Sequence, residues 1–357
     1  MIDKKGHPSM KTLKFIFSSL FSNETVIKES KNKPWWLAIV FMLVSCLISV
    51  IPNFVTVMKT NGSDILTQNA NYSIDYSLKK FSQDYLNSSQ IEIKIENGKL
   101  TAKNFDERIE VKHEEKITLV VQYVPYDAEN DRLLYDSYND KINAYVKEIK
   151  TSYDVENDGD TLKSHLYSTL ILGSESIFLY LYDNAAECTF KIEADNTKTV
   201  TKETSPAAQT YGTYKNISGD LAVISGYYKG NNDAECAENA MASWKTLFDK
   251  AYQSPRNVLA FQYSGMYLGI DILIIAVMGL MIFLLSRTKS SIQRYSYLQG
   301  LKMVSFSTLS PALLALILGF LIPALQSMGF LMFLILRVTW LGMKATSPAN
   351  NGQPVRK

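Results

Sequence analysis

Residues 35–58 read WWLAIVFMLVSCLISVIPNFVTVM and contain no Asp, Glu, Lys or Arg. At about 1.5 Å per residue, a helix of this length crosses a hydrocarbon core of about 30 Å with some tilt. Lys31 and Lys33 precede the run, and Trp35 and Trp36 stand where an interfacial aromatic belt belongs. The run is too long for a signal peptide and no small-residue cleavage site follows it, so it predicts an uncleaved first membrane span.

Further apolar segments lie near the other end of the chain. Residues 266–285 predict a second span. Residues 303–336 again contain no charged side chain, but as one helix they would reach about 50 Å, so we expect residues 326–329 to break them. A third span at 306–325 and a fourth at 328–343 result. A re-entrant hairpin is the alternative for this last stretch.

The charges divide the chain into compartments. The formal net charge is +2, yet residues 59–266 hold 31 acidic and 22 basic side chains, whereas the rest holds 4 acidic and 15 basic. Basic residues near span ends favour the cytoplasmic side. The N-terminal segment 1–34, the basic loop 286–305 and the tail 344–357 are therefore predicted to be cytoplasmic, which places residues 59–265 outside. The lipid bilayer is the partner this implies, and nothing in the charge balance favours nucleic acid.

The N-terminal segment contains a predicted amphipathic helix over residues 10–21. Its apolar residues share one face at helical spacing. They are Leu13, Ile16, Phe17, Leu20 and Phe21. Such a helix either lies on the inner membrane surface or packs against the cytoplasmic ends of the spans, and the sequence does not choose between the two.

The roughly 200 residues between the first two spans suffice for one domain with a hydrophobic core. Amphipathic helices are predicted near its two ends, at 74–85 and 237–251. Residues 91–95 alternate between apolar and polar, and Asn97-Gly98 is a hairpin turn. We also expect strands at 108–112, 116–123, 177–182 and 189–193, a helix at 141–150 and a polar loop at 195–210. The predicted fold is therefore a four-helix transmembrane region with a large extracytoplasmic α+β domain, its sheet mainly antiparallel, inserted between spans one and two.

Three cysteines are present. Cys46 falls within the first span and is interpreted as a packing residue. Cys188 and Cys236 share the predicted outer compartment, so they are disulfide candidates. Their bond would close a loop of about 48 residues and contribute about 4 kcal/mol of stability. Two separate thiols are the alternative, because sequence gives no distance between them.

The sequence matches the known catalytic and metal-binding motifs poorly. The three histidines lack a second His or Cys at metal-ligand spacing, and no Gly-rich phosphate loop or G-x-S-x-G motif occurs. Residues 154–160, DVENDGD, resemble the first half of a calcium loop, but the twelfth position is His165 instead of a bidentate Glu. An acidic solvated turn is the simpler interpretation. We expect no enzymatic activity, no cofactor and no bound metal.

Two ionisable residues fall inside the predicted spans. Asp271 lies about five residues from the outer end of the second span, and Arg337 about nine residues from the outer end of the fourth. Charges at such depth are costly and tend to face the bundle interior, often paired. An ion pair between Asp271 and Arg337 is one hypothesis. Two independent charges that reach toward opposite surfaces are the other.

Several short motifs resemble one family. KFIFSSLFS at 14–22 precedes the first span, IENGKL at 95–100 forms the predicted turn, and RYSY at 294–297 and STLSP at 307–311 lie in the C-terminal half. In layout and motifs the chain resembles the domain-of-unknown-function 1189 family of multi-pass membrane proteins from Gram-positive bacteria, some of which are described as maltodextrin utilisation proteins. The resemblance implies a bacterial cell-membrane location and an ABC-type sugar transporter as a candidate partner. It brings no catalytic residues.

We therefore interpret the chain as a non-enzymatic multi-pass membrane protein whose outer domain senses or binds a partner, as an accessory to carbohydrate uptake. One alternative is a small transport component, which would need to oligomerise because four spans form only a small bundle. The other is a membrane-anchored enzyme of the cell envelope, which the weak catalytic templates disfavour.

Overall fold

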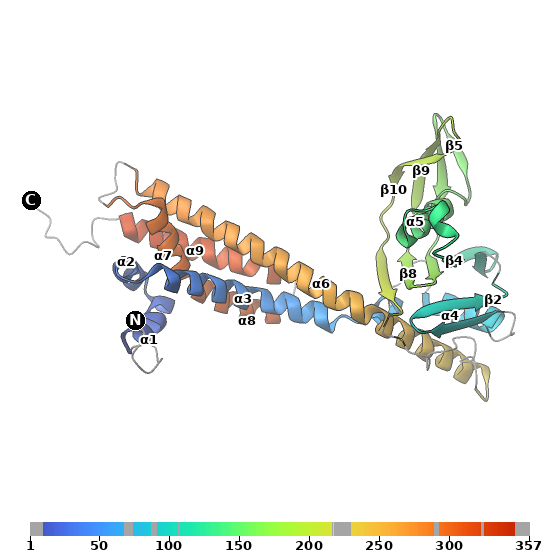
Figure 1. The fold of residues 1–357 in the computed structure, drawn as a ribbon, viewed down its shortest axis with the longest axis horizontal. Coiled ribbons are helices and arrows are strands. Elements are labelled where there is room, and N and C mark those ends of the chain that lie inside the picture. Colours follow the sequence, from blue (N-terminus) through green and yellow to red (C-terminus); the bar gives the residue numbers. More distant parts are fainter. Residues whose placement is uncertain are drawn as a thin grey trace, which may run out of the picture. The chain divides into compact units, whose positions relative to one another are not determined.

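The computed structural model describes residues 10–67, 74–86, 91–105, 108–215, 217, 230–288, 293–322 and 325–346. The chain forms two compact units, whose elements are drawn in Figure 1. We call Met1–Lys59 together with Val258–Lys357 the helical unit, and Thr60–Asn257 the inserted unit.

Long apolar helices dominate the helical unit. Its elements are α1 (Met10–Phe21), α2 (Asn23–Ser30), α3 (Trp35–Lys59), the part of α6 (Asp233–Leu285) from Val258 onward, α7 (Tyr297–Ser307), α8 (Leu309–Leu321) and α9 (Gln326–Thr346). Among the described residues, α3, α6 and α9 are long and apolar enough to cross a membrane. The bent pair α7 and α8 would make a fourth span. The chain thus has up to four such helices, with an α+β region between the first and the second.

The break in the last apolar stretch lies earlier than predicted. Residues 326–329 do not interrupt a helix; they belong to the beginning of α9. Instead α8 ends at Leu321, and Ile322 is extended, with φ −132° and ψ 84°. Ile322 precedes Pro323, whose ring disfavours a helical conformation in the residue before it. The proline, not the Gln-Ser-Met-Gly sequence, is the signal for the end of this helix.

Most of α7 lies in the stretch predicted as a basic loop. Its start is fixed by a capping box: the backbone N–H of Gln299 donates to Ser296 Oγ at 3.2 Å, and Gln299 Oε1 accepts from the N–H of Ser296 at 3.0 Å. Thr308 separates α7 from α8, and the helix direction changes there by 42°. The stretch predicted as the third span therefore belongs to a bent helix pair that begins at Tyr297 and is either a broken span or a re-entrant loop.

The inserted unit contains short helices and three sheets. Its helical elements are η1 (Gly62–Thr67), α4 (Ile74–Phe81), the π-helical turn η2 (Ser82–Leu86), η3 (Asp131–Leu133), α5 (Tyr138–Lys150) and the first part of α6. Its strands are β1 (Glu92–Glu96), β2 (Lys99–Lys103), β3 (Arg108–His113), β4 (Lys116–Val124), β5 (Glu156–Asp158), β6 (Thr161–His165), β7 (Thr169–Gly173), β8 (Ser176–Leu181), β9 (Glu187–Ile192), β10 (Lys198–Glu203) and β11 (Ala208–Thr213).

The strands pair mainly in antiparallel fashion. One sheet is the β1–β2 hairpin, the second has the order β10-β9-β6-β5, and the third has the order β11-β8-β7-β4-β3. Among the described strands, β4 with β7 is the single parallel pair, so this sheet is mixed. The predicted hairpin turn is confirmed, because Asn97 and Gly98 connect β1 to β2 with φ values of 51° and 75°.

The core of the inserted unit collects around Trp244 of α6, which is fully buried. Its ring centroid lies 6.1 Å from that of Phe81 and 6.2 Å from that of Phe248. Its indole N–H donates to Ser82 Oγ at 2.8 Å, which satisfies the polar atom of a buried aromatic side chain. The two amphipathic helices predicted near the ends of the domain therefore meet in one core.

Among the strands that were not predicted, β7 and β10 were missed for opposite reasons. The segment 195–210, predicted as a polar loop, contains β10 and the start of β11. β10 is an edge strand that is mostly exposed, so it carries no apolar alternation. β7 is buried at every position between β4 and β8, so its sequence TLILG shows a continuous apolar run and no alternation either.

Candidate functional site

A polar stripe on α3 is the most unusual feature inside the helical unit. Ser45, Ser49 and Asn53 recur every four residues, so they share one face of the helix, and all three are buried. Ser49 Oγ donates to the carboxylate of Asp271 on α6 at 2.5 Å and lies 2.8 Å from the carbonyl oxygen of Cys46. Asp271 is only 8% exposed. Its carboxylate is therefore held inside the bundle by a neutral hydroxyl.

The same stripe contacts the junction between α7 and α8. Thr308 is fully buried, and its hydroxyl lies 2.8 Å both from Ser45 Oγ and from the carbonyl oxygen of Ser305. The polar face of α3 thus meets α6 through Ser49 and the helix junction through Ser45. Two serines four residues apart in an uncharged segment are the sequence signal for this stripe, which was not among the predicted sites.

Arg337 of α9 has different partners. Its guanidinium donates to the carbonyl oxygen of Leu20 at 3.0 Å, and also to the carbonyl oxygen of Ser19 and to Ser310 Oγ. Ser19 and Leu20 lie in the last turn of α1, where the backbone carbonyl groups accept no hydrogen bond from an N–H group of the same helix. Arg337 therefore satisfies the C-terminal end of α1 and fastens it to α8 and α9.

The hypothesis of an ion pair between Asp271 and Arg337 is wrong in this structure. Asp271 bonds to Ser49, and Arg337 bonds to α1 and α8. The ion-pair hypothesis took partners for Arg337 from the predicted spans alone. Helix α1 also offers partners, because its terminal carbonyl groups are acceptors of the kind that a buried guanidinium needs.

In this structure Cys188 and Cys236 are both free thiols, which corresponds to the alternative of two separate thiols. Cys188 lies on β9, fully buried in a small cluster with Leu166 and Tyr182, and burial raises the pKa of its thiol. Cys236 lies in the first turn of α6 and is half-buried. The predicted shared compartment carried no information about the distance between the two cysteines.

The acidic segment 154–160 does not fold as a calcium loop. Residues 156–165 form the β5–β6 hairpin, with Gly159 at the turn in the left-handed region at φ 65°. The carboxylate of Asp158 lies 3.3 Å from the ammonium of Lys163, and Asp154 accepts a hydrogen bond of 2.5 Å from the Tyr167 hydroxyl. Within the described residues, no three His, Cys, Asp or Glu side chains are grouped so as to hold a metal ion.

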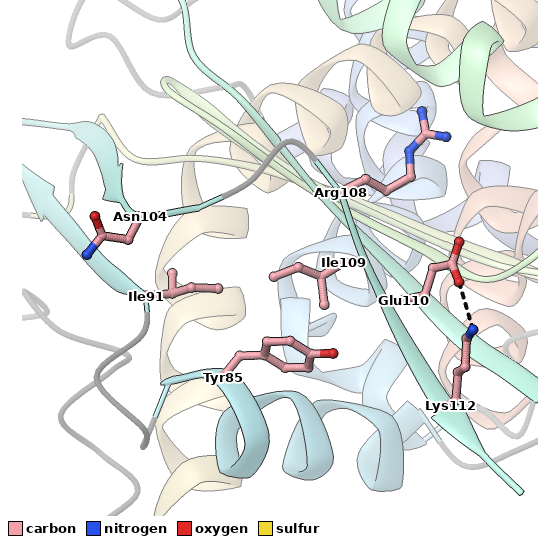
Figure 2. A pocket seen from close by; sticks show the side chains of 7 residues that line it. All are labelled: Tyr85, Ile91, Asn104, Arg108, Ile109, Glu110 and Lys112. Carbon is pink, nitrogen blue, oxygen red and sulfur yellow. Dashed lines mark ion pairs between the residues drawn. The ribbon is translucent and has the colours of Figure 1, made fainter. Parts of the chain in front are cut away.

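A hollow of about 840 Å³ lies beside β3, the last strand of the five-stranded sheet. Its lining residues are Tyr85, Ile91, Asn104, Arg108, Ile109, Glu110 and Lys112. Figure 2 shows the apolar side chains of Tyr85, Ile91 and Ile109 pointing into one space, with charged side chains along β3 beside it. Glu110 pairs with Lys112 at 3.2 Å, and Arg108 bonds to Glu148 of α5 at 3.1 Å. The hollow is amphipathic, and each of its charged side chains is in an ion pair, Arg108 with a carboxylate outside the lining.

A second hollow has a volume of about 520 Å³, and Lys112 lines it as well. Asp154 in this hollow has a left-handed backbone, at φ 47°, and it accepts from Tyr167. Burial, followed by the Asp154 carboxylate, raises the pKa of Tyr167 to about 12. The ring of His165 lies 4.5 Å from that of Tyr167. The hydroxyl proton of Tyr167 is therefore already engaged by Asp154.

Comparison with known proteins assigns no role to these residues. The chain matches no family model, no curated protein and no solved structure. Its function is therefore inferred from the two units themselves.

Proposed function

We propose that this protein is a non-enzymatic multi-pass protein of a bacterial cell membrane, with cytoplasmic chain ends and an extracytoplasmic binding domain. The observation that carries the proposal is the order of the parts: the inserted α+β unit lies between the first and second long apolar helices. Residues 59–266 hold the acidic excess, and the flanking parts hold the basic excess that favours the cytoplasmic side. The inserted unit is acidic, and the parts on both sides of it, which contain the candidate spans, are basic. This arrangement supports an outer location for the inserted unit.

A binding role for the inserted unit is supported by its two hollows. Ligand sites in proteins are concave and combine apolar walls with a few polar groups, and the hollow beside β3 has this character. The resemblance to the domain-of-unknown-function 1189 family supports carbohydrate uptake as the process and an ABC-type sugar transporter as the partner. The domain then acts as an accessory that binds the transporter or its ligand.

Co-purification from a mild detergent tests this role. We expect the wild-type protein to retain a transporter partner and Lys112→Glu to weaken that association, because Lys112 lines both hollows. Lys103→Glu is the matched control, since Lys103 lies on β2 outside both linings and its side chain is 75% exposed. A partner that is lost equally in both variants would argue against the hollows as the binding surface.

A small transport component is the second candidate, and the Asp271–Ser49 contact favours it. Ionisable groups buried within spans often mark ion or substrate pathways. Self-association without a transporter partner, together with solute uptake into proteoliposomes that Asp271→Asn abolishes, would favour this candidate. Uptake that Asp271→Asn leaves unchanged would count against it.

A further inference from the structure

Helix α1 presents two opposite faces. Phe15 and Ser19 are buried, whereas Phe17 is 65% exposed and Phe21 is 85% exposed. Residues two apart on an α-helix point about 200° apart, and residues four apart share a face. Phe17 and Phe21 therefore form an apolar surface on the side of α1 that faces away from the rest of the helical unit.

The inner face of α1 is held by specific contacts. The ring of Phe15 packs edge-on against Phe306, with centroids 5.0 Å apart, and lies 6.1 Å from the ring of Phe41. The ammonium of Lys33 lies 5.1 Å from the centroid of the Phe15 ring. At the other end of α1, Arg337 bonds to the terminal carbonyl groups. These contacts fix the rotation of α1 about its axis, so Phe17 and Phe21 cannot turn inward without breaking them.

Helix α8, which Arg337 ties to the end of α1, also has exposed apolar side chains. Arg337 joins the end of α1 to Ser310 of α8. From Ser310, Leu314 and Ile317 follow at i+4 and i+7 on the same face of α8, and both are exposed large apolar residues. Exposed apolar side chains thus occur on both of the helices that Arg337 connects.

Basic side chains accompany this surface. Lys14 lies on α1 and Lys31 follows α2, and both are exposed. Interfacial helices combine an apolar face with nearby Lys or Arg, because the cations are attracted to anionic headgroups. The exposed apolar side chains and the nearby positive charge both favour lipid as the occupant of this surface.

We propose that α1 is an interfacial helix whose Phe17 and Phe21 insert into the lipid of the inner leaflet, while Phe15 and Arg337 hold its opposite face to the bundle. The inference rests on the proposed function, since it requires the helical unit to lie in a membrane. It joins the two alternatives for residues 10–21: one face packs on the spans and the other contacts lipid. A second copy of the chain and bulk water are the rival occupants.

Spin-label accessibility tests this assignment. Phe17→Cys and Phe21→Cys are each made in a Cys236→Ser background, labelled, and reconstituted in vesicles of phosphatidylethanolamine and phosphatidylglycerol. Cys46 and Cys188 are fully buried, and the parent without the new cysteine measures any labelling of them. Collision with oxygen reports lipid exposure, and collision with a water-soluble nickel chelate reports water exposure. Leu314→Cys provides the lipid reference, and Lys28→Cys provides the water reference.

We expect both α1 labels to follow Leu314, with oxygen collisions several-fold more frequent than nickel collisions, and Lys28 to show the reverse. Nickel access at Phe17 and Phe21 with a normal Leu314 reference would overturn the inference and leave the proposed function standing. Low access to both reagents would also overturn it, in favour of a protein partner. Nickel access at Leu314 would instead refute the membrane location itself.

A second measurement covers the case in which the cysteine variants do not fold. Phe17→Trp and Phe21→Trp keep an aromatic ring at each position. In vesicles that contain brominated lipid, these variants should show a larger quenched fraction of tryptophan fluorescence than the parent protein. An unchanged quenched fraction would contradict insertion into lipid.

Discussion

The two units treat apolar side chains in opposite ways. In the inserted unit the largest apolar residues are interior, as for Trp244 and Phe81, which are fully buried. In the helical unit many large apolar residues face outward, including Leu321, which is 73% exposed. Burial from water drives the packing of the first unit, whereas lipid tails are as apolar as a leucine side chain and provide no such drive for the second. This difference is the one expected if the inserted unit folds in water and the helical unit in lipid, as proposed above.

The units also differ in how they hold charge. In the inserted unit the nearly buried Lys141 meets a carboxylate, with its ammonium 2.8 Å from both oxygens of Asp131, and this contact lowers the pKa of Asp131. In the helical unit Asp271 meets the hydroxyl of Ser49, and Arg337 meets carbonyl oxygens and a hydroxyl. These two charges of the helical unit are satisfied by neutral dipoles, so removal of either side of such a contact leaves a polar group without its partner.

Truncation of a large apolar residue should give the largest difference between the two units in the loss of unfolding free energy. Trp244→Ala should lower the free energy of unfolding of the inserted unit by about 3–5 kcal/mol, because it leaves a cavity in a fully buried core. Leu321→Ala, at an outward-facing position, should change stability by less than about 0.5 kcal/mol. Urea unfolding of the full-length protein in detergent, followed by near-UV circular dichroism, gives both values. Equal losses would contradict the reversed burial of the two units.

Close helix contacts in the helical unit give a smaller effect. A Cβ at Gly279 of α6 would lie 2.9 Å from the Cα atom of Leu301 in α7, so Gly279→Ala should cost about 1–3 kcal/mol through overpacking. Gly269 on the same helix has open space around it, and Gly269→Ala is the matched control. Thermal denaturation in detergent compares the pair. A Gly279 variant as stable as the control would show that α6 and α7 do not pack this closely.

A double-mutant cycle tests the polar contact across α3 and α6. Ser49→Ala and Asp271→Asn should be coupled by about 1–2 kcal/mol, since their side chains share one hydrogen bond. Asp271→Asn combined with Arg337→Gln should be additive within about 0.5 kcal/mol, because the two residues have separate partners. Unfolding in detergent measures both cycles. Strong coupling between Asp271 and Arg337 would instead indicate that these two residues form an ion pair.

Alkaline pH should affect the inserted unit through Tyr153. Burial raises the pKa of its phenol to about 12, while the unfolded chain has a tyrosine pKa of about 10. Between these values the unfolded state binds fewer protons, so stability is present below pH 10 and is lost as pH rises toward 12. Tyr153 should contribute up to about 1.4 kcal/mol per pH unit to this loss. Tyr153→Phe should flatten the pH profile of the unfolding free energy by that amount, and an unchanged slope would contradict the burial of this phenol.

Much of the fold was predictable because strong local signals and tertiary packing agreed. Charge-free runs marked the long helices, and the Asn97-Gly98 turn marked the first hairpin. β7 and β10 were missed because one strand is buried on both faces and the other is almost fully exposed, so neither alternates. The start of α7 had a readable signal in the capping box at Ser296, which the apolar pattern overshadowed.

The sites were less predictable than the elements. Composition identified Asp271 and Arg337 as the charges inside the spans, but it could not choose their partners. A hydroxyl on α3 and the carbonyl groups at the end of α1 are ordinary groups whose importance depends on tertiary packing. The cysteines show the same limit. The sequence pattern predicts the compartment of Cys188 and Cys236, but only the fold determines the distance between them.

Reporter fusions after residues 206, 293 and 346 test the central claim of the account most directly. These positions follow the strand β10, the helix α6 and the helix α9. A pair of reporters, one active only outside the membrane and one only inside, is joined to each position in cells. The account predicts an outside signal at 206 and inside signals at 293 and 346. An inside signal at 206 would contradict the outer location of the inserted unit, and with it the proposed binding role.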